Sequence, residues 1–266
     1  MKRLAAIAML AVAAAAQAAS EEAVTIPTRD GVTLSYLLVH EPATAPKIIV
    51  VSFIGGPGVI NLAKRAAAGP LKFGPTVNFL IRARAQFADA EFADVIVDAP
   101  SDQLPGGMAD EFRMSAQHQA DIRALLADLR KRFPDARIYL MGTSRGSISV
   151  AALAASLGNA VQGAVLSSTV TNRDKVGAAL SGFDFDTIKI PLLLVHHRQD
   201  GCFTSPYAGA ERLGKRFPLV SVSGGDAAQS GPCEPLSPHG YIGLDAEVAK
   251  AVRAWMQGRE YAHEIP

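Results

Sequence analysis

Ser144 lies in a pattern that could make its hydroxyl reactive. Residues 142–146 have the sequence GTSRG, with a glycine two residues before and two residues after the serine. The apolar run 136–141 before it predicts a buried strand, and residues 147–153 after it predict the start of a helix. A strand, a G-x-S-x-G turn and a helix in this order are typical of a nucleophile elbow. We therefore predict that Ser144 is a catalytic nucleophile.

A reactive serine needs a base and a carboxylate that orients this base. In nucleophile-elbow enzymes the chain order is serine, acid, histidine, so both partners are expected downstream. Asp200 follows the apolar run 190–195, and His239 lies between the last expected strand and the last expected helix. We predict that His239 takes the proton of Ser144 and that Asp200 holds the imidazole in the right tautomer.

The sequence also offers rival residues for both roles. The rivals are Asp174, Asp184 and Asp186 as the acid, and His196 and His197 as the base. The two rival histidines precede Asp200 and lie close to it in the chain, whereas His239 follows it. The chain order therefore favours Asp200 and His239.

A negative charge that develops on the substrate needs backbone N–H donors, which form an oxyanion hole. One donor is expected from Arg145, the residue after the nucleophile, and the other from the loop after the strand at 47–53. That loop begins with Gly55 and Gly56, either of which could donate, whereas Pro57 has no N–H. The side chain of Arg145 could orient a substrate or form a surface ion pair.

Cys202 and Cys233 are the two cysteines of the chain. In an exported protein a pair of cysteines favours a disulfide, whereas a metal site would call for closer C-x-x-C spacing. Closing a loop of about 32 residues would contribute roughly 3–4 kcal/mol of stability. Because these cysteines lie near Asp200 and His239, the bridge would also join the loops of the acid and the base.

The first 18 residues predict a secretory signal peptide. Lys2 and Arg3 precede the apolar run 4–15, which is too short to span a bilayer, and an A-x-A cleavage site follows at 16–18. We predict export to the periplasm or the medium, with residues 19–266 as one domain and no membrane span. The net charge of +1 gives no indication of nucleic-acid binding.

Short β-branched runs alternate with helical patterns along the rest of the chain. Residues 24–26 and 32–39 predict a hairpin around an Asp-Gly turn. Further strands are expected at 47–53, 93–97, 138–141, 161–166, 190–195 and 219–222, and helices at 78–92, 122–133, 209–217 and 248–256. Alternating strands and helices predict an α/β fold, with a mostly parallel sheet of about eight strands covered by helices. In such sheets ligands bind at the carboxyl ends of the strands, where the candidate residues lie.

With these elements and motifs, the chain resembles the α/β-hydrolase superfamily, and most closely its small exported bacterial members. The resemblance rests on the segment 142–146, Asp200, His239 and the glycines at 55–56, and it spans nearly all of residues 19–266. It implies a serine hydrolase that cleaves a small-molecule ester or related acyl bond through an acyl-serine intermediate, with no cofactor and no metal.

The sequence departs from some members of that superfamily. Ile54 stands where the glycine loop of proline-releasing aminopeptidases has a histidine, and residues 168–189 are too few for a helical cap. The segment 59–77 contains two Gly-Pro pairs and predicts a loop, which we expect to line the substrate pocket together with residues 102–108.

The sequence leaves three functions to consider: a carboxylesterase-like enzyme, a peptidase or thioesterase of the same fold, and a non-catalytic binding protein that retains the fold.

Overall fold

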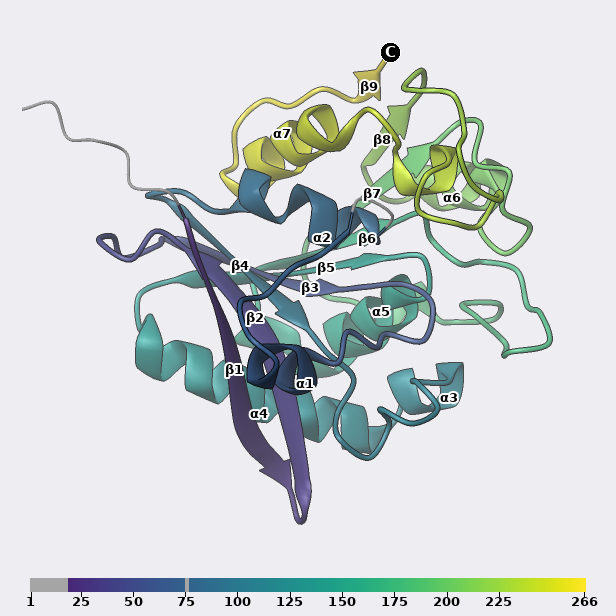
Figure 1. Ribbon diagram of the computed structural model, residues 1–266. Coiled ribbons are helices and arrows are strands. Elements are labelled where there is room, and N and C mark those ends of the chain that lie inside the picture. The colour runs from purple at the N-terminus through teal and green to yellow at the C-terminus, as the bar shows by residue number, and fades with distance from the viewer. Residues whose placement is uncertain (1–18, 75–76) are drawn as a thin grey trace, which may run out of the picture.

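A twisted sheet of nine strands forms the centre of the described molecule (Figure 1). The computed structural model describes residues 19–74 and 77–266, so the expected signal peptide lies outside the described residues. The strand order is β1-β2-β4-β3-β5-β6-β7-β8-β9; β2 is antiparallel to β1 and β4, and all other neighbours are parallel. The strands are β1 Ser20–Arg29, β2 Val32–His40, β3 Ile48–Phe53, β4 Phe92–Val97, β5 Arg137–Thr143, β6 Gly163–Ser167, β7 Leu192–His197, β8 Leu219–Val222 and β9 Glu264–Ile265.

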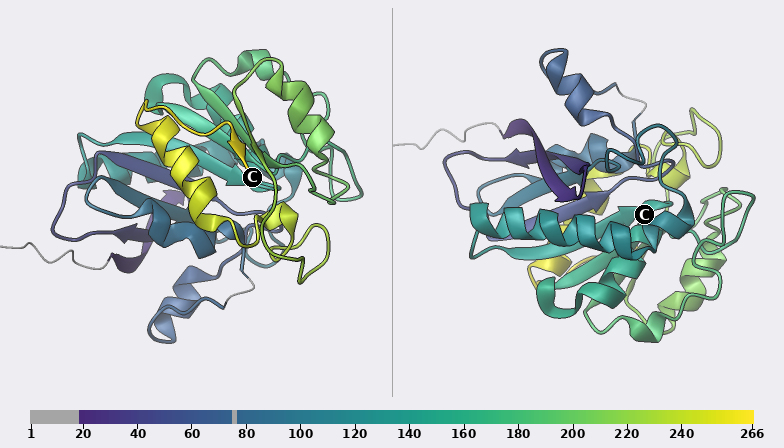
Figure 2. Two further views of the ribbon diagram at one scale, coloured as in Figure 1. Left: turned by 90° about the horizontal axis from the view of Figure 1, so that it is seen from above. Right: turned by 90° about the horizontal axis from the view of Figure 1, so that it is seen from below.

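Helices cover both faces of this sheet, as the two views in Figure 2 show. The α-helices are α1 Leu62–Ala67, α2 Phe79–Ala83, α3 Asp110–Arg113, α4 Ala116–Arg132, α5 Gly146–Leu157, α6 Tyr207–Gly214 and α7 Asp245–Met256. The 3-10 turns are η1 Arg84–Phe87, η2 Gly158–Ala160, η3 Phe185–Thr187 and η4 Pro238–Gly240. Apolar residues of α4 and α5 pack on one face of the sheet, and those of α2, η1 and α7 pack on the other. The core therefore consists of two layers, one on each face.

The predicted fold class is confirmed, with differences at particular elements. The eight expected strands are present within a few residues of their predicted bounds, and the two-residue β9 extends the sheet by one. β3 alternates its side chains between the two core layers and is buried along its whole length. This two-sided burial explains why β3 has a continuous apolar sequence.

The segment 59–77, expected to be a loop, contains helix α1. Its residues Leu-Ala-Lys-Arg-Ala-Ala are strong helix formers. The Asp98 carboxylate at the end of β4 accepts hydrogen bonds from the N–H groups of Ile60 and Leu62, at 2.6 and 2.7 Å, and so fixes the start of the helix. A carboxylate distant in sequence thus orders this segment. Residues 75 and 76 lie outside the described part.

The helix expected over 78–92 is shorter in the structure. Helix α2 begins after Asn78, whose side chain accepts from the N–H of Leu80, and the helical conformation ends with η1 at Phe87. The Asp89 carboxylate then accepts from the N–H groups of Glu91 and Phe92, at 2.8 and 3.0 Å. This turn redirects the chain into β4.

The turn from β5 to α5 brings three backbone segments into close contact. A Cβ atom added at Gly142 would lie 2.3 Å from the carbonyl oxygen of Gly146, and one added at Gly146 would lie 2.0 Å from that of Phe53. Both distances are far below any normal contact. Glycine at these two positions therefore allows the start of α5 to pack against the end of β3.

We expect Gly146→Ala to lower the free energy of unfolding by about 2–3 kcal/mol, because backbone atoms must shift to admit the methyl group. Urea unfolding followed by circular dichroism measures the change. Gly106→Ala is the matched control, since a Cβ there meets nothing within 4 Å. Equal stability of the two variants would contradict the close contact at Gly146.

Asp94 is a buried carboxyl group inside the sheet, on β4 between β2 and β3. Its Oδ1 accepts from the hydroxyl of Ser52 at 2.7 Å, whereas Oδ2 has no partner among the described residues. Burial raises the pKa of Asp94 to about 7, because the charged form loses its hydration. The folded protein therefore binds a proton at this site that the unfolded chain has released.

Between the ordinary pKa of an aspartate and about 7, this extra proton makes stability fall as pH rises. We expect Asp94→Asn to remove that loss, so that its melting temperature relative to the wild type increases from pH 4 to pH 8. Thermal unfolding across this pH range measures the difference, and the exposed Asp135→Asn is the control. A difference that stays constant with pH would refute the prediction.

Candidate active site

Ser144 occupies the sharp turn between β5 and α5. Its φ angle is +54°, in the left-handed region that non-glycine residues rarely adopt, at a cost of about 1–3 kcal/mol. The N–H of Ser144 donates to the carbonyl of Ser167 on β6 at 3.0 Å, and the N–H of Ser147 donates to the carbonyl of Ser144 at 2.8 Å. These bonds hold the strained residue between the sheet and the helix, and its side chain is only half-buried.

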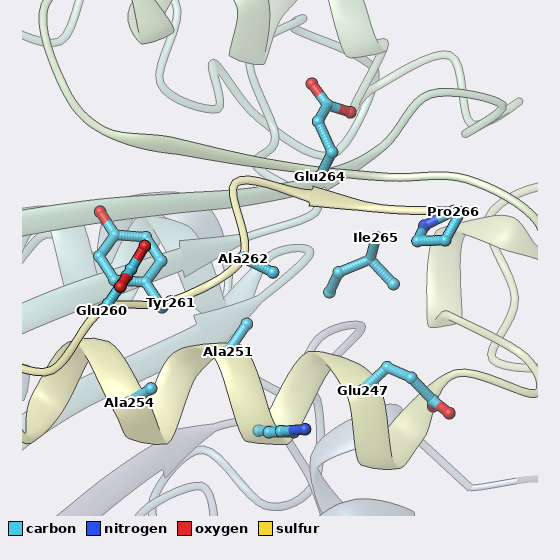
Figure 3. A pocket seen from close by; sticks show the side chains of 10 residues that line it. Glu247, Ala251, Ala254, Glu260, Tyr261, Ala262, Glu264, Ile265 and Pro266 are labelled. Atoms are coloured by element: carbon cyan, nitrogen blue, oxygen red, sulfur yellow. The ribbon is translucent and has the colours of Figure 1, made fainter.

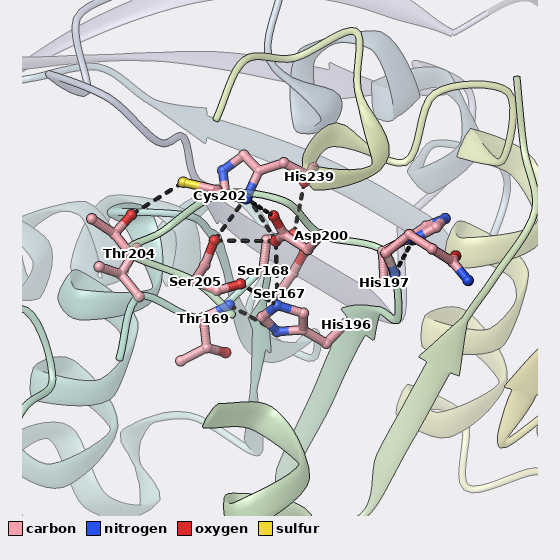
Figure 4. A network of polar contacts seen from close by, with 12 residues as sticks. Ser167, Ser168, Thr169, His196, His197, Asp200, Cys202, Thr204, Ser205 and His239 are labelled. Atoms are coloured by element: carbon pink, nitrogen blue, oxygen red, sulfur yellow. Dashed lines mark hydrogen bonds and ion pairs between the residues drawn. The ribbon is translucent and has the colours of Figure 1, made fainter. Parts of the chain in front are cut away.

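Asp200 lies on the loop after β7 and is the centre of a polar network (Figure 4). Its Oδ2 accepts from His239 Nδ1 at 2.9 Å, from His196 Nε2 at 3.2 Å and from the Ser205 hydroxyl at 3.1 Å. Its Oδ1 accepts from the N–H of Cys202 at 2.9 Å. Burial alone would raise the pKa of Asp200, but the bonds from His196 and His239 hold that pKa well below its ordinary value. The carboxylate is therefore ionised at neutral pH.

His239 lies in turn η4 with its Nδ1 directed to this carboxylate. An ionised carboxylate only accepts hydrogen bonds, so Nδ1 carries the proton and Nε2 is left with a free lone pair. His239 Nε2 is buried and has no hydrogen-bond partner among the described residues. The imidazole is thus set to accept a proton at Nε2.

The backbone on both sides of His239 is fixed by buried contacts. The carbonyl of His239 accepts from the Ser168 hydroxyl at 2.8 Å. The buried Tyr241 hydroxyl donates to the carbonyl of Val195 at 2.8 Å and accepts from the N–H of Ser168 at 3.1 Å. Burial raises the pKa of Tyr241 to about 12, so the phenol stays neutral and keeps its donor. These bonds tie η4 to the ends of β6 and β7.

Arg82 of α2 holds the same loop from the other side. Its guanidinium donates to the carbonyls of Pro235 and Gly240, at 3.1 and 2.6 Å, and pairs with Asp245 at 2.8 Å. The residues whose carbonyls it binds flank His239 in the chain. Arg82 was not among the site residues predicted from the sequence, because the contact joins residues that lie 153 positions apart in the chain.

A cavity of about 240 Å³ brings the candidate residues together. It is lined by Gly55, Gly56, Pro57, Asn78, Phe79, Thr143, Ser144, Cys233, Glu234, Pro235, His239 and Gly240. The predicted nucleophile, base and glycine loop thus share one space, and Asp200 lies behind the base. No hydrogen bond joins Ser144 to His239 within residues 19–74 and 77–266.

The glycine loop packs directly against Ser144. A Cβ at Gly55 would lie 2.7 Å from the Cβ of Ser144, and the N–H of Gly58 closes a turn onto the carbonyl of Gly55 at 3.2 Å. The N–H groups of Gly55, Gly56 and Arg145 donate to no other residue in the described part of the chain. Three backbone N–H groups without a hydrogen-bond partner among the described residues therefore lie close to Ser144.

The side chain of Arg145 forms ion pairs on the far side of the turn. Its guanidinium binds Asp110 at 2.5 Å and Asp174 at 2.6 Å. Of the two roles considered for this side chain, the structure shows the ion pair. The rival acid Asp174 is thereby engaged with Arg145, and its described side-chain contacts include none with a histidine.

The rival histidines His196 and His197 are buried at the end of β7 and do not line the cavity. The Nε2 of His196 donates to the carbonyl of Ser205 at 2.8 Å and to Asp200, while its Nδ1 accepts from the N–H of Thr169 at 3.3 Å. The second imidazole on Asp200 was not anticipated from the sequence. His196 contributes to the network as a donor to the acid.

The predicted disulfide between Cys202 and Cys233 is confirmed. Its Cα atoms lie 4.5 Å apart, and it spans 31 residues of sequence. It joins the loop of Asp200 to the segment that precedes His239.

Among the described residues, no group of histidines, cysteines and carboxylates could hold a metal ion, and no helix is long and apolar enough to cross a membrane.

The expectation about the pocket walls was wrong. None of the described residues of 59–77, and none of the residues of 102–108, lines the cavity. Asp98 fixes the start of α1, which does not line the cavity, and the N–H of Met108 donates to the carbonyl of Pro57. The wall is formed by Asn78, Phe79 and the segment 233–235 instead.

A larger cavity of about 550 Å³ lies elsewhere, between α7 and the C-terminal segment (Figure 3). Ala251 and Ala254 of the helix face the strand segment that bears Ala262 and Ile265. It contains none of the predicted site residues, and the carboxylate of Glu264 at its rim pairs with Arg198. The size of a cavity therefore does not indicate where the reactive groups lie.

No protein-family model matches the sequence, and no curated protein matches it. Solved structures match over most of the chain. Est1E from Butyrivibrio proteoclasticus is 15% identical with a TM-score of 0.58, over 89% of this chain and 98% of its own. An α/β serine hydrolase without lid from Xanthomonas campestris is 17% identical with a TM-score of 0.56, over 88% and 94% of the two chains.

Dienelactone hydrolase from Anabaena variabilis is 16% identical with a TM-score of 0.58, over 91% of this chain and 99% of its own. At such low identities the likeness concerns the fold and leaves the activity open. The mostly parallel sheet, the helices on both faces and these neighbours agree with the resemblance seen in the sequence. The chain has the α/β-hydrolase fold.

Proposed function

We propose that this protein is a serine hydrolase that cleaves a carboxylic ester or a related acyl bond of a small molecule. One observation carries the proposal. Ser144, in a strained left-handed turn, shares a small cavity with His239, whose Nδ1 is held by a buried, ionised Asp200. Strained backbone at a cavity that also holds an oriented imidazole is characteristic of catalytic sites.

The reaction follows from these groups. The Ser144 Oγ attacks the acyl carbon while His239 Nε2 takes its proton, and the carbonyl oxygen becomes an oxyanion. The N–H of Arg145 and that of Gly55 or Gly56 donate to this oxyanion. The intermediate collapses to an acyl-serine as the leaving alcohol takes the proton from His239. Water, deprotonated by His239, then releases the acid and restores the serine.

The dimensions of the site favour short acyl groups. The cavity of about 240 Å³ is small, and the segment between β6 and β7 contains only the 3-10 turn η3 among its described regular elements. A segment without α-helices cannot form the helical cap that would enclose a large substrate. A neighbour in structure is likewise described as lacking a lid.

We also propose that the protein acts outside the cytoplasm. A disulfide and the lack of a membrane-spanning helix among the described residues are compatible with export. The signal-like segment 1–18 would direct it to the periplasm or the medium.

The proposal is tested by treating the oxidised protein with a fluorophosphonate and locating the adduct by mass spectrometry. We expect one adduct, on Ser144, that is lost in Ser144→Ala and slowed at least about 100-fold in His239→Ala, because the base no longer takes the proton. His40→Ala serves as a control outside the site. A folded protein that forms no adduct would support the non-catalytic alternative.

Oxidised protein that has not been treated with the fluorophosphonate is then assayed with p-nitrophenyl esters of increasing chain length. Turnover of acetate and butyrate should exceed that of palmitate. Faster turnover of the palmitate ester would overturn the proposed substrate size while leaving the reaction type intact.

The disulfide should support both stability and turnover, because it joins the loops of Asp200 and His239. For the double variant Cys202→Ser, Cys233→Ser we expect the free energy of unfolding to fall by about 3–4 kcal/mol. We also expect kcat to fall about tenfold at a temperature at which the variant is fully folded, since the two groups lose their fixed separation. Loss of stability with unchanged kcat would limit the bridge to a structural role.

A further inference from the structure

Arg113 is a fully buried arginine behind the glycine loop, at the end of α3. Its Nη2 donates to the carbonyl of Gly56 at 2.8 Å, its Nη1 to the Ser149 hydroxyl at 3.1 Å and its Nε to the carbonyl of Met108 at 3.3 Å. Gly56 belongs to the glycine loop, and Ser149 lies in the first turns of α5. One side chain thus bridges the two parts of the site that carry the free N–H donors.

No carboxylate lies within ion-pair distance of this guanidinium in the described part of the chain. Burial lowers the pKa of Arg113 to about 10, so the side chain still carries its charge at neutral pH. A buried charge without an ionic partner costs stability, and an apolar side chain of similar volume is often the more stable choice. The structure therefore retains a buried charge of this kind, and two of its three hydrogen bonds go to the glycine loop and to α5.

We propose that Arg113 is a positioning residue for the oxyanion hole, which it sets by holding the Gly56 carbonyl at a fixed distance from α5. The inference rests on the proposed hydrolase function. Gly56 has a φ of +57°, and the next residue, Pro57, has no N–H with which to anchor the turn. Without Arg113, the Gly56–Pro57 peptide loses its side-chain partner. The two preceding peptides, which carry the N–H groups of Gly55 and Gly56, are then free to shift with it.

Asp110 at the other end of α3 completes the arrangement. Its carboxylate binds the guanidinium of Arg145 and accepts from the N–H of Ala179 at 2.9 Å. Arg145 supplies the other proposed oxyanion donor through its backbone N–H. The single turn of α3 therefore contacts both halves of the oxyanion hole, one through Arg113 and one through Asp110.

The test compares Arg113→Gln and Arg113→Lys with the wild type, using p-nitrophenyl acetate and protein whose reactive serine has been titrated. For Arg113→Gln we expect kcat to fall about 10- to 100-fold, with KM within about twofold, because misplaced donors weaken binding of the transition state alone. Arg113→Lys should recover part of this loss, since an ammonium reaches the Gly56 carbonyl or Ser149 but not both.

Two further variants separate positioning from general destabilisation. Arg84→Gln is the matched control: Arg84 pairs with Glu21 and donates to the carbonyl of Ile81, away from the cavity, so its loss should leave kcat unchanged. Ser149→Ala removes one of the three acceptors of Arg113 and should lower kcat about two- to fivefold. If Arg113→Gln does not fold, Arg113→Lys and Ser149→Ala decide the matter, and unchanged kcat in both overturns the inference.

The outcomes also separate this inference from the proposed function. If the wild type hydrolyses the ester no faster than Ser144→Ala, the hydrolase proposal and the role of Arg113 fail together. If hydrolysis depends on Ser144 but every Arg113 variant retains its kcat, only the positioning role is refuted. A rise in KM with kcat unchanged would likewise refute it, because only binding shared by the ground state and the transition state would then have been lost.

Discussion

The site depends on one steric constraint, which is that Ser144 takes a left-handed backbone conformation while three other segments crowd around it. The φ angle of +54° costs free energy that only neighbouring contacts can offset. Those contacts require that Gly142, Gly146 and Gly55 carry no side chain, since a Cβ at any of them would overlap the turn or the end of β3. The absence of a side chain at these three glycines thus permits both the close packing of β3, β5 and α5 and the exposure of Ser144.

Asp200 and His239 are held by a different interaction, the full hydrogen-bond pairing of a buried charge. Asp200 can remain ionised inside the protein because imidazole, hydroxyl and backbone donors surround its two oxygens. Burial raises the pKa of Asp94, which has one described hydrogen-bond partner, to about 7. Both carboxyl groups are buried, so the opposite directions of their pKa shifts follow from the different number of donors around them.

Much of this architecture could be predicted from the sequence because it is encoded locally. Continuous β-branched runs located the strands of the sheet, and the presence of two cysteines in a chain predicted to be exported indicated the disulfide. Helix α1 was missed because Asp98, more than thirty residues away, orders its start. The contacts of His196, Arg82 and Arg113 were not predicted for the same reason. Their partners are backbone carbonyls or a shared carboxylate in distant segments, and no local pattern marks such contacts.

Arg82 and Arg113 show the same way of holding loops at the ends of strands. Such loops carry the reactive groups, yet their carbonyls have no neighbouring strand to pair with. A guanidinium offers five donors in a rigid plane, so one side chain can hold several carbonyls at once. Arg82 does this for Pro235 and Gly240 around the base, and Arg113 does it for Gly56 and Met108 around the glycine loop. Arg82 is also paired with Asp245, whereas no carboxylate lies within ion-pair distance of Arg113 in the described part of the chain. The hydrogen bonds of Arg113 to the two carbonyls and to Ser149 therefore have to offset the burial of its charge without an ion pair.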